Sequence, residues 1–293
     1  MKLQQRGFTL IELMISLAIG LIVVAAAIIL FISSQKSIAL QQGASDIQDN
    51  SNFALNYIAK DIRMANLGNS SASMTSNTAG GGVVLNKANL SATTTVNDSF
   101  LSRAKVSGTS NVDVDSDQLV IQYKPLATGG FDCEGNQIDD TSQYVIQRYF
   151  IRRDANFSTN ETEETALALA CDAGRYSGNA ATNFGDNGQI VMKRVDYFHV
   201  LLVTENSAGN FRDMAIDDYI GLAEKPRILG VKIGVLARSS QSVGTEPNID
   251  NSKPFNVLGQ EVSLNSTIQN AEIKNLREVI AQSVAIRNAL GER

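Results

Sequence analysis

The sequence has few of the residues that build metal and catalytic centres. Its 293 residues include one histidine, His199, two cysteines, Cys133 and Cys171, and no tryptophan. Structural zinc sites commonly use four cysteine or histidine ligands, and these three residues lie far apart in the sequence. His199 sits in an apolar stretch with no nucleophile at a sharp turn near it, which favours a packed histidine over a catalytic base. We therefore expect a protein that is not an enzyme and has no metal site and no cofactor.

Basic residues and prolines are also scarce. The chain has 25 lysines and arginines against 30 aspartates and glutamates, for a net charge of -5. Sequence-independent nucleic acid binding depends on neutralising phosphates with basic side chains, so no direct nucleic acid binding is expected. The first of the four prolines is Pro125. Because proline breaks the interior of a helix, no residue of this kind interrupts a helix before that point.

A long apolar run lies near the N-terminus. Residues 8–32 contain one charged side chain, Glu12. As an α-helix the run is long enough to cross a hydrocarbon core of about 30 Å. Lys2 and Arg6 precede it, which predicts a cytoplasmic N-terminus and a periplasmic remainder. A secretory signal has a shorter apolar core followed by a small-residue cleavage site. The run is therefore predicted to be a transmembrane helix that stays with the protein.

Glu12 distinguishes this run from a simple signal anchor, the main alternative. A charged side chain inside a bilayer costs about 2.5–3.5 kcal/mol and is usually kept for a partner. The sequence GFTLIE at residues 7–12 resembles the processing site of type IV pilins and type II secretion pseudopilins. The resemblance implies that prepilin peptidase removes residues 1–7, cutting between Gly7 and Phe8, and that the Phe8 amine is then methylated. It also implies that Glu12 pairs with the terminal amine of a neighbouring subunit during assembly.

Helical periodicity continues beyond the apolar run. We predict one helix whose first half, residues 8–32, is in the membrane and whose amphipathic half, residues 33–67, packs on a folded domain. Gly43 is a weak point, costing about 1 kcal/mol relative to alanine, and Gly68 is a candidate C-cap. The apolar residues of the second half that share one helix face are Ile47, Ala54, Ile58, Ile62 and Ala65.

Residues 68–293 have the pattern of a β-rich globular domain. A polar stretch at 68–82 comes first, and later clusters of glycine, asparagine and aspartate separate segments rich in β-branched and aromatic residues, as in an antiparallel sheet. The tail, 273–290, fits a helix or a strand, and resemblance favours a final strand. The predicted fold class is α+β, a long N-terminal α-helical spine packed on an antiparallel β-sheet domain. The expected strand segments are 118–124, 143–152, 164–170, 189–203 and 228–237.

Cys133 and Cys171 both follow the predicted membrane span. In an exported domain, two cysteines predict one disulfide, and two buried free thiols are the alternative. Residues 111–117 hold three aspartates and raise the possibility of a calcium loop. An EF-hand loop that began at the first of them would need glycine and glutamate where Gln118 and Lys124 stand. An acidic turn that leads into a strand is the better interpretation.

Several segments between the spine and the C-terminus resemble PilW-like minor pilins. This resemblance implies a non-enzymatic subunit that is held in the inner membrane and then incorporated into the extracellular pilus. Its implied partners are prepilin peptidase, other minor pilins and the major pilin, and its implied role is to prime pilus assembly, with a place at the pilus tip beside a candidate tip adhesin. The segments are DIRMA at 61–65, DCEG at 132–135, YVIQRYFIRR at 144–153, LALAC at 167–171, GVKIGVLARSS at 230–240 and VAIRN at 284–288.

Two other functions share parts of this pattern. A type II secretion pseudopilin of the J kind has the same spine and sheet, although its periplasmic domain is usually smaller. A signal-anchored periplasmic binding module or adhesin would need the apolar run but not Glu12. The sequence leaves open which surfaces contact which pilins, and whether the pili serve motility, adhesion or DNA uptake.

Overall fold

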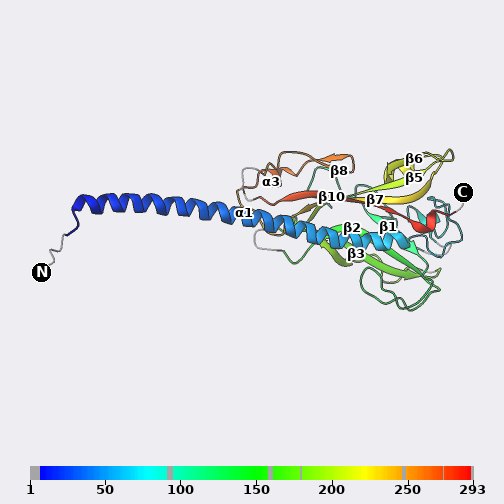
Figure 1. Ribbon diagram of the computed structural model, residues 1–293. Coiled ribbons are helices and arrows are strands. Elements are labelled where there is room, and N and C mark those ends of the chain that lie inside the picture. The colour runs from blue at the N-terminus through cyan, green and yellow to red at the C-terminus, as the bar shows by residue number, and fades with distance from the viewer. Residues whose placement is uncertain are drawn as a thin grey trace.

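One long helix, α1 (Leu10–Met64), gives the molecule its elongated outline. In Figure 1 the first half of α1 projects away from the folded domain, and the second half lies along it. The computed structural model describes residues 7–90, 95–157, 161–178, 180–245, 249–272 and 274–291. The predicted spine and the predicted antiparallel β-rich domain are both confirmed.

The described part of the folded domain forms two four-stranded antiparallel sheets and a small hairpin. The first sheet has the order β1-β2-β3-β4, and the second has the order β10-β7-β5-β6. The strands of the first sheet are β1 (Leu119–Tyr123), β2 (Tyr144–Arg153), β3 (Leu167–Tyr176) and β4 (Gln189–Lys193). Those of the second are β5 (Val195–Glu205), β6 (Phe211–Ala215), β7 (Arg227–Arg238) and β10 (Arg277–Ala285). The hairpin pairs β8 (Phe255–Val257) with β9 (Gln260–Val262).

The described residues also form short helices before, between and after these strands. Two are α-helical, α2 (Ile216–Gly221) and α3 (Ser266–Gln269). Three are single 3₁₀ turns, η1 (Lys87–Asn89), η2 (Asp98–Phe100) and η3 (Arg287–Ala289).

The second half of α1 supplies one wall of the main core. It contacts β1 and β4 of the first sheet and β7 and β10 of the second. One continuous apolar cluster therefore joins side chains of the helix to side chains of both sheets, including Ile58, Tyr149 and Phe198. Because the helix is part of the core, moving it would expose apolar surface from both sheets.

The segment 189–203, expected as one strand segment, is divided between the two sheets. Arg194 lies between β4 and β5 and adopts a left-handed backbone conformation, with φ of 60°. Its guanidinium is buried and forms ion pairs with Asp154 at 2.8 Å and Glu161 at 2.8 Å. These contacts compensate for an unfavourable backbone conformation. Hydrophobic patterning could not reveal the division, because both halves are apolar.

The end of α1 differs from its prediction, whereas the C-terminal tail agrees with its prediction. The helix ends at Met64 with Ala65 as C-cap, so the prediction of Gly68 as the C-cap is wrong. The tail forms strand β10, which pairs with β7 over nine residues, as resemblance favoured. Residue 273, the first of the predicted tail segment, lies outside the described residues.

Candidate functional site

The predicted processing point lies immediately before α1. Gly7 and Phe8 are non-helical and exposed, and the Phe8 side chain is 91% exposed. Thr9 is the N-cap, so the first turn of the helix begins two residues after Phe8. Lys2 and Arg6, on which the predicted orientation depends, lie outside the described residues. The peptide bond between Gly7 and Phe8 is therefore accessible, and the cleavage itself stays a prediction.

Glu12 closes a capping box at the start of α1. Its Oε2 accepts hydrogen bonds from the backbone N–H of Thr9 at 2.9 Å and from the Thr9 hydroxyl at 2.8 Å. In return, the Glu12 N–H donates to the Thr9 hydroxyl oxygen at 3.3 Å. The carboxylate also lies where the helix dipole favours negative charge. The spacing Thr-x-x-Glu before an apolar run is the sequence signature of this cap, a role of Glu12 separate from the predicted pairing.

The first half of α1 carries an apolar surface that its own chain does not cover. From Leu10 to Ile32, every large apolar side chain is more than half exposed. The most apolar stretch of the helix has a mean hydropathy of 3.1, and by length and composition α1 can cross a membrane. Water is a poor solvent for such a surface. Lipid or neighbouring helices are the environments that suit it.

Burial on α1 begins at Gly43, where the chain after β7 crosses the helix. A Cβ on Gly43 would lie 3.3 Å from the Ser239 Cβ and 3.5 Å from Val243 Cγ1. The Asp46 carboxylate accepts a hydrogen bond from the Ser240 N–H at 2.9 Å. Glycine therefore allows close approach at the point where the helix enters the domain. Helix propensity alone marks Gly43 only as a weak point, because the close approach depends on residues about 200 positions away.

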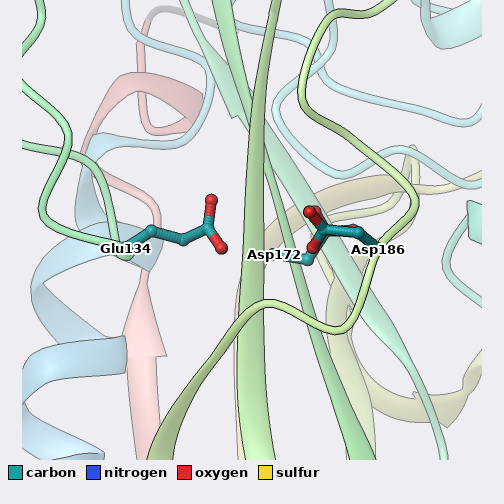
Figure 2. A group of neighbouring side chains, drawn as sticks. All are labelled: Glu134, Asp172 and Asp186. Carbon is teal, nitrogen blue, oxygen red and sulfur yellow. The ribbon is translucent and has the colours of Figure 1, made fainter.

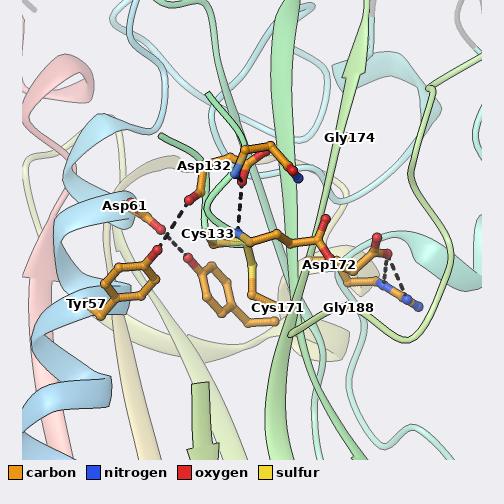
Figure 3. The surroundings of a disulfide bond; sticks show 12 residues. Tyr57, Asp61, Asp132, Cys133, Cys171, Asp172, Gly174 and Gly188 are labelled. Atoms are coloured by element: carbon orange, nitrogen blue, oxygen red, sulfur yellow. Dashed lines mark hydrogen bonds and ion pairs between the residues drawn. A yellow bond between two sulfur atoms is a disulfide. The ribbon is translucent and has the colours of Figure 1, made fainter. Parts of the chain in front are cut away.

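Asp61 attaches the last turns of α1 to the first sheet. Its side chain is buried, and the Tyr149 hydroxyl donates to Asp61 Oδ2 at 2.6 Å. One turn earlier, the Tyr57 hydroxyl donates to the Asp132 carbonyl at 3.3 Å (Figure 3). Burial raises the pKa of Asp61 to about 6. Of the two charged residues in the DIRMA segment, Arg63 is exposed, whereas Asp61 is buried.

Asn66 connects the end of α1 to two other parts of the chain. It adopts a left-handed conformation with φ of 63°, which asparagine tolerates better than most residues. Its Nδ2 donates to the carbonyls of Ser71 at 2.9 Å and Asn288 at 3.0 Å. Its Oδ1 accepts from the Gly82 N–H at 3.2 Å. A side chain without an obvious role in the sequence thus holds the helix end, the polar stretch and the C-terminal turn together.

The predicted disulfide between Cys133 and Cys171 is present. It ties the loop after β1 to strand β3, with a sequence separation of 38 and 6.1 Å between the two Cα atoms (Figure 3). Closing a loop of this length stabilises the fold by about 4 kcal/mol in the chain-entropy treatment.

The acidic stretch at 111–117 uses its carboxylates to hold turns. Asp113 accepts a hydrogen bond from the Ser263 N–H at 2.8 Å, and Asp115 accepts from the Gly108 N–H at 3.0 Å. Asp117 lies 2.7 Å from Nδ1 of the buried His199. These contacts agree with an acidic turn and a packed histidine, and they provide His199 with a structural partner.

Comparisons with known proteins place the clearest similarity at the N-terminus. Residues 2–28 match the family described as "Prokaryotic N-terminal methylation motif". Among solved structures, the chain is similar to a type IV-like pilin from Thermus thermophilus, with 13% sequence identity and a TM-score of 0.41. That similarity covers 83% of this chain and 97% of the other. A search of curated proteins finds no match.

Proposed function

We propose that this chain is a minor pilin of a type IV pilus. Its N-terminus carries the methylation motif of prokaryotic prepilins, which supports assignment to the type IV pilin superfamily. Pilin architecture and the motif indicate a structural protein rather than an enzyme. The proposal rests chiefly on the uncovered apolar half of α1 with one carboxylate near its start. A lone anchor needs the apolar surface but not the charge.

Processing would begin at the exposed bond between Gly7 and Phe8. Apart from its neighbours in the chain, no described residue has an atom within 4 Å of the place that a Cβ on Gly7 would take. The fold itself therefore makes no steric demand for glycine here, and the requirement would come from the peptidase that binds this segment. Removal of residues 1–7 and methylation would leave a cationic amine on Phe8, one residue before the helix cap.

Assembly would use Glu12 as the partner of a neighbour's amine. Four helical residues span about 6 Å, so a parallel subunit displaced by this distance brings its Phe8 amine beside Glu12. In a low-dielectric surrounding, either charge alone is costly and the pair is favourable. Within one subunit, the Glu12 carboxylate is already satisfied by Thr9. The amine of the neighbouring subunit would then pair with a carboxylate that the capping box already holds in place.

Substitutions at Glu12 separate pairing from capping. Glutamine can still accept the capping hydrogen bonds, whereas alanine cannot. We expect both Glu12→Gln and Glu12→Ala to be processed normally, yet to show at least a tenfold lower ratio of sheared-fibre to membrane protein on immunoblots, since the charge is absent in both. Thr9→Ala, which weakens the cap and keeps the charge, is the matched control and should be incorporated better than either. Normal incorporation of Glu12→Gln would contradict the pairing role.

The folded domain would supply the contacts that are specific to each partner. We infer that the subunit is stored in the inner membrane with its domain in the periplasm, joins other minor pilins and the major pilin, and primes the pilus from a place at its tip. A type II secretion pseudopilin would share the same N-terminal motif. Deleting the gene distinguishes the two, because loss of surface pili supports the minor pilin and loss of protein secretion with normal pili supports the pseudopilin.

A further inference from the structure

Three carboxylates meet beside the disulfide, and the proposed pilin function does not use them. Glu134 comes from the loop after β1, Asp172 from β3 and Asp186 from the β3–β4 connection. One oxygen from each lies within 4.8 Å of the others. Figure 2 shows Glu134 and Asp186 reaching toward strand β3 from opposite sides.

Asp172 brings a buried and unsatisfied oxygen to this cluster. The residue is fully buried. Its Oδ2 accepts from Arg148 Nε at 3.0 Å and from the Gly185 N–H at 2.9 Å. Its Oδ1 is buried and has no hydrogen-bond partner in the described part of the chain. A buried polar atom without a partner is costly and uncommon in native proteins, so an unpartnered carboxylate oxygen within an acidic cluster is a candidate ligand atom.

The local charge is also uncompensated. Arg148 pairs with Asp172 and donates its Nη2 to the backbone carbonyl of Asp186 at 2.7 Å. The nearby Asp132 is neutralised separately by Arg175, at 2.7 Å. Three carboxylates and one guanidinium leave a formal charge of about -2, which one divalent cation would balance.

Covalent and hydrogen-bonded restraints hold the carboxylates in position. Glu134 directly follows Cys133, and Asp172 directly follows Cys171, so the disulfide fixes the distance between their backbones. Asp186 accepts the Gly188 N–H at 2.7 Å, which shapes its own turn. Positioning of this kind lowers the entropy cost of gathering the three side chains around an ion.

We propose that Glu134, Asp172 and Asp186 bind one divalent cation of the Ca²⁺ type. The donors are all carboxylate oxygens, which hard cations prefer, and the cluster has no nitrogen or sulfur ligand. Asp186 is exposed and Glu134 is partly exposed, which leaves room for water ligands. Two of the three ligands come from loops, a setting that suits the flexible coordination of Ca²⁺ better than the strict octahedron of Mg²⁺. This site lies apart from residues 111–117 and departs from the sequence expectation of no metal.

The test is the midpoint temperature of thermal unfolding. It is measured by circular dichroism on the full chain in mild detergent, after dialysis against a chelator. For a dissociation constant on the order of 10⁻⁴–10⁻³ M, 10 mM Ca²⁺ should raise the midpoint by about 3 °C or more. Mg²⁺ at the same concentration should raise it by less than half as much. Glu134→Gln and Asp186→Asn should abolish the Ca²⁺ shift, and Asp218→Asn, an exposed carboxylate on α2, should retain it.

Equilibrium dialysis with radioactive Ca²⁺ gives a second measurement that does not depend on unfolding. We expect one saturable Ca²⁺ per wild-type chain and at least tenfold weaker binding by Glu134→Gln, with near-ultraviolet circular dichroism confirming that the variant is folded. A wild-type chain that binds no Ca²⁺ at 10 mM would overturn the proposal. Binding by Glu134→Gln and Asp186→Asn as tight as wild type would also overturn it.

Discussion

At the scale of single residues, Asp61 is a carboxylate placed where ionisation is unfavourable. Burial raises its pKa from 3.8 to about 6, and the hydrogen bond from Tyr149 offsets only part of that cost. The folded state thus holds the Asp61 proton more tightly than the unfolded chain does. The contribution of this group to stability is complete below pH 4 and declines as the pH rises to about 6. Above that pH, the ionised carboxylate costs about 3 kcal/mol relative to the acidic limit.

We predict that Asp61→Asn reduces this dependence on pH. Urea unfolding of the full chain in detergent, followed by tyrosine circular dichroism, should show a wild-type free energy of unfolding that falls by up to about 3 kcal/mol more than the variant's between pH 4 and pH 7. Asp49→Asn, at an exposed position on α1, should keep the wild-type slope. If the free energy of unfolding of Asp61→Asn fell with pH as steeply as that of the wild type, the pH dependence would come from other groups.

Asp196 shows the opposite behaviour, because two arginines face it. It is fully buried and accepts from Arg277 Nε at 2.7 Å and from Arg238 Nε at 3.1 Å. Burial alone would raise the pKa of Asp196, but the guanidinium groups of Arg277 and Arg238 hold it below its ordinary value. The carboxylate therefore links β5 to β7 and β10 as a charged group.

We predict that Asp196→Ala lowers the free energy of unfolding by about 3–5 kcal/mol, because the buried guanidinium of Arg277 loses its carboxylate and that of Arg238 keeps only Glu161, at 2.7 Å. The matched control is Asp213→Ala, which removes the half-exposed ion pair with Lys232. That change should cost about 1 kcal/mol or less. Similar losses in the two variants at neutral pH would contradict the view that burial makes the Asp196 contacts important.

At the scale of elements, Gly43 determines how closely α1 approaches the strand-end segment at 239–243. An added Cβ would lie 3.3 Å from the Ser239 Cβ, which is closer than usual, so a larger side chain would have to displace Ser239 and Val243. We predict that Gly43→Leu lowers the free energy of unfolding by about 1–3 kcal/mol through overpacking. Gln42→Leu, one residue earlier and exposed, should change it by less than about 0.5 kcal/mol. Hydrogen exchange should show faster exchange around residue 43 in Gly43→Leu alone.

Local sequence patterns predicted the helices and strands that depend on residues close together in the sequence. The apolar run, the helical spacing of Ile47 to Ile62, and the β-branched segments each carry their own periodicity, and the corresponding elements are present. The division at Arg194 depends on Asp154 and Glu161, which lie more than thirty residues away. Sheet order depends in the same way on pairing between distant strands.

The candidate site shows the same separation between local and distant causes. Gly7, Phe8 and Glu12 lie within six consecutive residues, so a short motif could identify them. Asp61 looks like an ordinary helix charge until Tyr149 covers it. The cluster of Glu134, Asp172 and Asp186 exists only after the chain has folded and the disulfide has formed. No spacing rule applied to the sequence would have joined these three residues.

At the scale of the whole molecule, the two halves of α1 lie in different environments. The second half of α1 is part of the domain core, while the first half presents apolar side chains with no cover from the described chain. In the proposed assembly, such a surface would pass from lipid to packed helices without meeting water. A continuous helix, with a capped start and a start accessible to a peptidase, suits a subunit that moves from a membrane into a fibre.

The mass of the N-terminal peptide from the membrane-bound protein tests this account most directly. We predict that digestion and mass spectrometry find a chain beginning at Phe8 with one added methyl group, and a chain beginning at Met1 in cells that lack the prepilin peptidase. A chain that begins at Met1 in wild-type cells, with the bond between Gly7 and Phe8 intact, would contradict the account and favour a signal-anchored protein.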